Sequence, residues 1–243
     1  KTGAGTLWLG NSVNWAGETL IAEGVLELNS SFGNGTQTSG GIFRIGRGAA
    51  FAVSGDNLNF NGVTVEFLSD GGGMLANWGG WDSRNWQVNS GMTIRSTGGE
   101  RNVFSGLNHG PTLNGNNLVF DIARGSDATS DLLASIPFRG DGGILKQGNG
   151  ILTLSGANDY TGATTINAGT LKIGDAGTSG TLGSGNVIIA SGAILEINRS
   201  DAYTPPAGQT FSGPGTLVKN HGGNLTFLGT GANQSLVSGL EKL

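Results

Sequence analysis

The chain has 243 residues, of which 47 are glycine, 5 are proline and none is cysteine, and its formal net charge is −4. Recurrent Val, Ile, Leu and Phe pairs without a strict Gly-X-Y period exclude collagen and argue against a disordered low-complexity chain. Only 12% of the residues are charged and no Lys/Arg run is present, so a nucleic-acid partner is not expected. No apolar run approaches the length of a membrane span, so we expect no direct membrane insertion of this segment.

From the N-terminus, the sequence predicts short strands separated by glycine, asparagine and serine turns. Leu7 and Leu9 flank Trp8, and Leu26 and Leu28 repeat the same alternation. Apolar residues at every second position indicate half-buried strands. Further pairs of this kind are Phe43/Ile45, Phe51/Val53, Leu58/Phe60, Val63/Val65, Met92/Ile94 and Leu118/Phe120.

Two segments in the middle of the chain lack this alternation. Residues 70–90 are rich in glycine and tryptophan, and residues 123–137 are rich in small and polar side chains. We interpret both as irregular insertions that project from a single domain spanning residues 1–243. Within the second, residues 131–134 can form one helical turn.

The alternation resumes after residue 142, where the sequence repeats its own beginning. Residues 146–173 align without a gap with residues 1–28, and a third, looser copy begins at Gly213. The identical pairs are Lys1/Lys146, Gly3/Gly148, Gly5/Gly150, Leu7/Leu152, Leu9/Leu154, Gly17/Gly162, Thr19/Thr164, Ile21/Ile166, Gly24/Gly169 and Leu26/Leu171. Such self-similarity is typical of a solenoid, in which each unit buries its apolar face against its neighbours.

The repeats favour an all-β parallel β-helix over an antiparallel sandwich. Parallel coils place equivalent side chains directly above one another, which imposes a recurring pattern. The residues expected to carry this scaffold are Leu7, Leu9, Leu26, Gly148, Gly150, Leu152, Leu154, Tyr160, Gly162, Gly169 and Leu171.

The run GGILKQGNGILTLSGANDYTGATTINAGTLKI at residues 142–173 resembles the autotransporter-associated β-strand repeat, also called the passenger-associated transport repeat. Gly148, Gly150, Asn158 and Tyr160 stand where that motif expects them. The resemblance implies a right-handed parallel β-helix from a longer secreted or surface-displayed bacterial passenger, commonly adhesive or stalk-like. It implies no catalytic residues, because the motif is a scaffold motif.

Three of the five tryptophans, Trp78, Trp81 and Trp86, form the strongest candidate for ligand contact. Flat aromatic faces stack on sugar rings, and aromatic residues are enriched at binding hot spots. The alternative is that the indoles cover an apolar flank of the rod. The candidate partners are therefore a glycan or a host or surface protein.

Asp121, Asp127 and Asp131, together with Arg124, are the candidates for enzyme chemistry. A β-helical polysaccharide-processing enzyme needs paired carboxylates on one face. These residues lie in or beside an irregular loop, which favours ordinary solvated charges. The two histidines lie far apart and no ligand spacing for a transition metal is present, so we predict no catalytic residue, no metal and no cofactor.

The sequence thus predicts a non-catalytic structural or adhesive rod at the bacterial cell surface or outside the cell. Because Lys1 and Lys242 occupy the same place in the repeat, neither end has an evident polar cap. We therefore expect head-to-tail self-association, within a longer parent chain or between copies in a fibre. The alternative is a polysaccharide-processing enzyme, or a glycan-binding module that uses the Trp-rich insertion.

Overall fold

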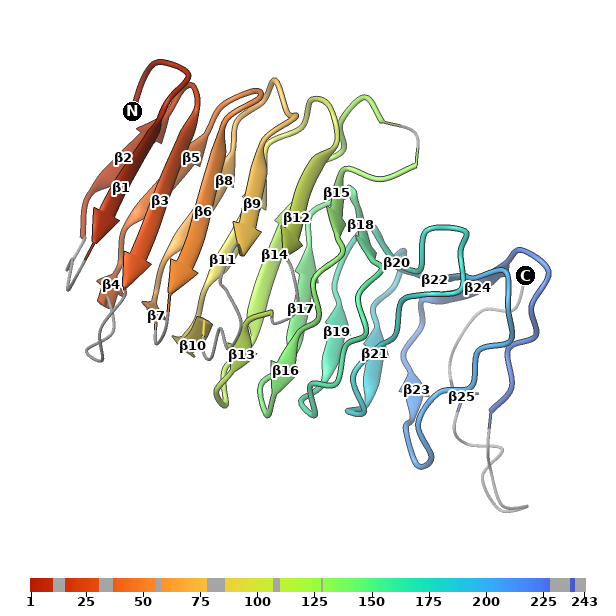
Figure 1. Ribbon diagram of the computed structural model, residues 1–243. Helices are drawn as coiled ribbons and strands as arrows, with labels where there is room; N and C mark the ends of the chain where they lie inside the picture. The colour runs from red at the N-terminus through yellow and green to blue at the C-terminus, as the bar shows by residue number, and fades with distance from the viewer. Residues whose placement is uncertain are drawn as a thin grey trace.

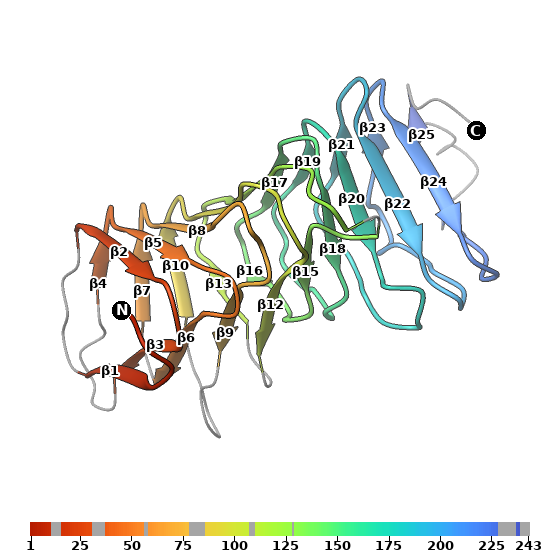
Figure 2. The same cartoon turned by 90° about the horizontal axis from the view of Figure 1, so that it is seen from above.

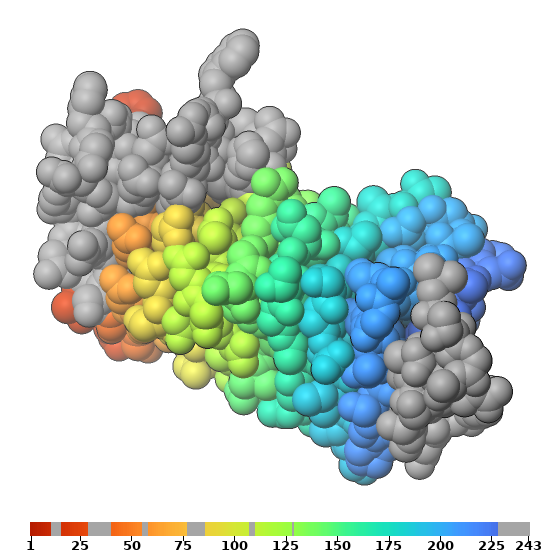
Figure 3. All heavy atoms as spheres, turned by 90° about the horizontal axis from the view of Figure 1, so that it is seen from below, coloured from red at the N-terminus to blue at the C-terminus, as the bar shows by residue number. Residues whose placement is uncertain are grey.

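The structure, a computed structural model, describes residues 1–10, 16–30, 37–55, 58–77, 86–106, 110–127, 129–227 and 237–238. All regular structure in these residues is β-strand. The strands wind around one axis, and the coils follow one another from the N-terminal to the C-terminal end (Figure 1). The same succession is visible as bands of colour in the space-filling view (Figure 3). Within the described ranges there is no helix of the length and apolarity that a membrane crossing requires.

In the part of the chain that the structure describes, three sheets form the walls of the rod. The first sheet has ten strands: β1 (Thr6–Gly10), β3 (Val25–Ser30), β6 (Ala50–Gly55), β9 (Met74–Asn77), β12 (Asn102–Gly106), β15 (Leu132–Ala134), β18 (Ile151–Leu154), β20 (Thr170–Ile173), β22 (Ile194–Asn198) and β24 (Thr216–Asn220). The second has ten: β2 (Glu18–Ile21), β5 (Ile42–Ile45), β8 (Thr64–Phe67), β11 (Thr93–Ser96), β14 (Leu118–Ile122), β17 (Ile144–Gln147), β19 (Thr164–Ile166), β21 (Val187–Ile189), β23 (Phe211–Ser212) and β25 (Val237–Ser238). The third has five: β4 (Gln37–Ser39), β7 (Leu58–Asn61), β10 (Trp86–Ser90), β13 (Thr112–Leu113) and β16 (Arg139–Gly140).

The strands pair in parallel, each with its equivalent one coil away. In the first sheet, Leu152 is in register with Leu132 on one side and with Leu171 on the other. Seen from above, the strands of the two ten-stranded sheets follow one another in the same order along the rod (Figure 2). The predicted all-β parallel β-helix is therefore confirmed.

The core runs without interruption along the axis. Inward positions of the first sheet stack Leu26, Phe51, Leu75 and Phe104, each at most 1% exposed. A fully buried side chain of this kind contributes roughly 1.5 to 3 kcal/mol to stability. The core is therefore a set of side-chain ladders that needs no disulfide, in keeping with the absence of cysteine.

The two segments expected as insertions are more regular than their sequences suggest. Residues 70–90 contain β9 and β10, and residues 123–137 contain β15; all three strands are paired within the sheets. The predicted helical turn at residues 131–134 is wrong, because most of that segment forms β15 between β12 and β18. Backbone partners on both sides override the weak local pattern. Residues 78–85 lie outside the described residues.

The third wall changes its construction after β16. In the next coil, the loop between β18 and β19 takes its place: the Asp159 N–H donates to the Phe138 carbonyl, and the Thr161 N–H to that of Gly140. Asn158 Oδ1 accepts from the Phe138 N–H at 2.8 Å, and its Nδ2 donates to the Thr181 carbonyl at 2.6 Å. Side-chain hydrogen bonds thus supplement the backbone ladder in this wall.

Candidate functional site

The lysine of the repeat closes the turn between successive coils. Lys146 is fully buried, and its Nζ donates to the carbonyls of Gln147 (2.7 Å), Gly148 (2.8 Å) and Ala168 (3.1 Å), the last in the following coil. Burial lowers the pKa of Lys146 to about 8, although nearby carboxylates oppose this shift. At neutral pH the ammonium therefore remains charged and satisfies three carbonyl groups.

Lys1 makes the same kind of contacts, whereas Lys219 of the third copy lies in β24 of the first sheet and makes a related set of contacts with the preceding coil. Lys1 Nζ donates to the carbonyls of the next two residues and to that of Glu23, one coil on. Lys219 Nζ donates to the next two carbonyls and to Arg199 O of the preceding coil at 2.8 Å. The lysine is therefore a recurring link between coils.

The glycine that faces this turn leaves no room for a side chain. Gly169 has φ +66°, and a Cβ there would lie 2.5 Å from the Gly150 carbonyl oxygen and 2.6 Å from that of Gly148. Gly24, with φ +67°, meets the equivalent carbonyls of the first repeat at 2.5 Å. Close approach and a left-handed backbone together require glycine at both positions.

The remaining predicted scaffold residues occupy the walls and the core. Leu26, Leu152, Leu154 and Leu171 are buried, and Tyr160 is fully buried in the third wall, with its hydroxyl 2.6 Å from Thr164 Oγ1. Gly162 lies in that wall against Gly142 of the preceding coil. In the first coil, Leu7 is 44% exposed, whereas Leu9 packs against the core.

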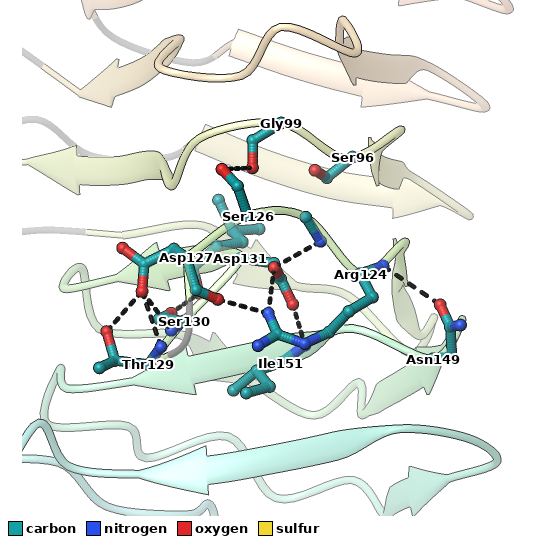
Figure 4. A network of polar contacts seen from close by, with 12 residues as sticks. Ser96, Gly99, Arg124, Ser126, Asp127, Thr129, Ser130, Asp131, Asn149 and Ile151 are labelled. Carbon is teal, nitrogen blue, oxygen red and sulfur yellow. Dashed lines mark hydrogen bonds and ion pairs between the residues drawn. The ribbon is translucent and has the colours of Figure 1, made fainter.

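The carboxylate of Asp131 organises the turn before β15 (Figure 4). It is 1% exposed; its Oδ1 accepts from the Arg124 guanidinium at 2.6 Å and from the Gly125 N–H at 2.7 Å, and its Oδ2 from the Ile151 N–H at 2.6 Å. Both oxygens therefore hold backbone and a cation in place. They are not presented to a groove as a general acid or base.

Asp127 has a similar local role in the same turn. Its Oδ1 accepts from the Thr129 hydroxyl and N–H, each at 2.7 Å, and from the Ser130 N–H at 3.1 Å. These hydrogen bonds, those from Thr129 first, lower the pKa of Asp127. Asp121, the third candidate, pairs with Arg95 at 3.3 Å. Among the described residues, no three His, Asp or Glu side chains gather as a metal site requires.

Of the three candidate tryptophans, the structure describes Trp86. Trp86 begins β10 and is 3% exposed, with its ring edge-to-face against Phe60 and Phe104 at centroid distances of 5.1 and 5.2 Å. Its indole therefore packs on protein within the core. Trp78 and Trp81 lie outside the described residues, so their contact with a ligand stays a prediction.

An ion-pair ladder that sequence reasoning missed crosses the outer face of the second sheet. Arg44 contacts Glu18 at 2.6 Å and Glu66 at 3.0 Å, and Arg95 contacts Glu66 at 3.4 Å and Asp121 at 3.3 Å. Parallel in-register strands would otherwise stack like charges, which destabilises a sheet. Alternating signs keep neighbouring coils attracted to one another.

Sequence reasoning also missed a group of side-chain amides on the outer face of the third sheet, which we call the amide cluster. Its members are Asn59, Gln87, Asn89, Asn114 and Asn116. Asn89 Nδ2 donates to Asn59 Oδ1 at 2.8 Å, and Asn114 Nδ2 donates to Asn89 Oδ1 at 2.5 Å and to Gln87 Oε1. Asn116 Nδ2 donates to the backbone carbonyls of Asn89 and Asn114 at 2.6 and 2.9 Å. The sequence feature that could have revealed the amide cluster is the recurrence of Asn at the ends of strands in successive coils.

Ladders of apolar side chains, lysine links and tight glycine turns define a parallel β-helical repeat protein. Residues 1–28 and 144–173 match the family model of the passenger-associated-transport-repeat, so these two segments belong to that repeat family, as the resemblance implied.

One curated relative extends the match beyond the repeats. The chain is 34% identical over 159 residues to "Adhesin BmaC autotransporter" of Brucella suis biovar 1 (strain 1330), an alignment that covers 63% of this chain and 4% of that protein. The chain thus spans a small part of that relative's length. No solved structure matches it.

Proposed function

We propose that the chain is part of the passenger of a bacterial autotransporter, displayed at the cell surface or secreted, where it serves as a non-catalytic adhesive rod. The observation that carries the proposal is the presence of two passenger-associated-transport repeats in a chain that also resembles an autotransporter adhesin. We infer the adhesive role from the relative's name and the rod shape from the parallel β-helix.

The construction of the rod suits such a role. Its stability comes from apolar ladders, lysine links and ion pairs that recur along the axis, and it contains no cysteine. Each coil adds strands to the sheets, so a long chain built from similar repeats presents an extended outer surface. Of the candidate acidic residues, Asp127 and Asp131 hold the turn before β15, and Asp121 pairs with Arg95 in the ion-pair ladder, so each has a structural contact.

Surface display and adhesion are tested separately. Antibodies against the 243-residue chain should label intact bacteria that produce the parent protein. Beads coated with the chain should be retained on host cells or on extracellular matrix. Beads coated with Leu152→Asp, which places a charge in the core ladder, serve as the matched control. Equal retention of both beads would reject the adhesive role, and release of reducing ends from polysaccharides would reject the non-catalytic one.

Head-to-tail self-association is a second proposal. In the 243-residue chain, β1 and β2 are edge strands of their sheets, and Leu7 and Leu20 are 44% and 50% exposed. Unpaired parallel edges of this kind accept a further strand. Sedimentation should show mass that rises with concentration, and Leu20→Lys should suppress it. A strictly monomeric chain at high concentration would contradict this proposal.

A further inference from the structure

We propose that the amide cluster is a binding site for an uncharged glycan. This inference rests on the proposed adhesive function and assigns it a face of the rod and a class of ligand. Asn89 is exposed, and the other four members are half-buried at the surface of the third sheet. The site is therefore accessible and partly held in place by its neighbours.

The hydrogen bonds within the cluster leave a mixed set of groups for a ligand. Each side-chain amide has two N–H donors and an oxygen with two lone pairs. Within the described residues, Gln87 Nε2 has no acceptor, and the Oδ1 atoms of Asn114 and Asn116 have no donor. Asn89 uses one donor and one acceptor of its amide, so one N–H remains. A sugar hydroxyl both donates and accepts, so donors and acceptors side by side match a polyhydroxylated ligand.

An irregularity in β10 brings the central amide into this position. Val88 is in register with Phe60, but Ser90 is in register with Asn61, so Asn89 is an extra residue in the strand. Bulges of this kind re-aim a side chain and are common beside functional sites. Here the bulge places Asn89 between Asn59 of one coil and Asn114 of the next.

The surroundings favour an uncharged glycan over other partners. Protein interfaces depend on aromatic or large apolar anchors, and the exposed large hydrophobic residues of the described chain are elsewhere, in the first and second sheets. Among the described residues, charges at the β16 end are engaged with other groups: Asp141 Oδ1 accepts from the Gly115 N–H at 2.6 Å, and Arg139 lies 3.9 Å from Asp159. The cluster itself carries no charge to attract a polyanion. A polymer also fits, because strands spaced by about 4.8 Å repeat the contacts along the rod.

The test uses the 243-residue chain and an array of neutral and sulfated oligosaccharides, followed by titration of the tightest neutral binder. Gln87→Glu keeps the acceptor that Asn114 uses but removes both free N–H donors, and should weaken binding at least fivefold. Gln87→Ala combined with Asn89→Ala should weaken it more than tenfold. Asn220→Ala, an exposed amide at the end of β24 that bonds Glu196, is the matched control and should bind as the wild type does. Unchanged thermal midpoints show that each variant is folded.

Three outcomes would overturn the inference. The first is that the wild type binds no neutral oligosaccharide on the array. The second is that Gln87→Glu binds the glycan as tightly as the wild type does. The third is that the variants lose self-association although the wild type binds no glycan, which would make the amide cluster a contact between copies of the chain. The bead assay separates this inference from the proposed function. If coated beads adhere although no neutral glycan binds, the glycan site falls and the adhesive function stands. If beads do not adhere but a neutral glycan binds through the cluster, the glycan site stands and the adhesive function falls.

Discussion

The repeat coils and the coils between them solve the same packing problem in different ways. In both copies of the repeat a coil advances by 19 residues, as the pairings of Thr6 with Val25 and of Ile151 with Thr170 show. The coil that pairs Asn102 with Leu132 takes 30 residues. The longer coils have length for a strand in the third sheet, whereas the second repeat uses Asn158 and Tyr160 in that wall. Coil length alone does not decide this, because the 24-residue coil from Ala50 to Met74 contains β7, whereas the 24-residue coil from Thr170 to Ile194 contributes no strand to the third sheet.

The largest expected effect tests the tight turn of the repeat. Gly169→Ala should destabilise the chain by about 5 kcal/mol, because the new Cβ overlaps two backbone carbonyls and φ is +66°. Gly192→Ala has a similar φ of +75° but meets no atom within 4 Å, so it should cost only about 1 kcal/mol. Urea unfolding of both variants measures the difference. Equal costs would show that the close approach between coils is unimportant.

The lysine link should have the next largest effect. Lys146→Met removes a buried ammonium that satisfies three carbonyls, and we expect a loss of about 4 kcal/mol. Lys172→Met, which removes a less deeply buried lysine in the next coil, is the comparison and should cost less. Equilibrium unfolding monitored by circular dichroism gives both values. If Lys146→Met were as stable as the wild type, the lysine link would not contribute to the stability of the repeat.

The side-chain-supported third wall predicts a pH dependence at alkaline pH. Burial raises the pKa of Tyr160 to about 12, so between the ordinary tyrosine value near 10 and 12 the unfolded chain loses this proton first. Stability should therefore be intact below pH 10 and fall as the pH rises to 12, by about 3 kcal/mol in all. Tyr160→Phe should flatten most of this slope, although Tyr203, whose pKa burial also raises, keeps part of it. An identical slope in wild type and variant would contradict the assignment.

The smallest expected effect belongs to the longer coils. Arg44→Glu places three carboxylates in neighbouring coils of the second sheet, next to Glu18 and Glu66. The thermal midpoint should fall slightly, and high salt should restore part of the loss because Glu18 and the side chain at position 44 are accessible to solvent. Arg44→Gln should lie between wild type and Arg44→Glu. A loss that does not depend on salt would show that packing, not charge, is responsible.

The sequence by itself determined the architecture through its repeats. Leu152 and Leu171 are in the ladder expected of them, and the glycine and lysine positions of the motif recur in the turns. This is predictable because a parallel coil imposes the same local rule on each copy, and copies within one chain can be compared directly. The same comparison explains why the family of the two repeats was recognisable from so few residues.

Only the tertiary structure decided which outer side chains meet. β15 forms from a weak pattern because β12 and β18 supply its hydrogen bonds, and Trp86 enters the core with β10. The amide cluster and the ion-pair ladder join residues about one coil apart, and coil length varies from 19 to 30 residues. An error of one residue in that length turns a side chain from one face of the sheet to the other. Contacts between coils therefore depend on a register that only the folded chain establishes.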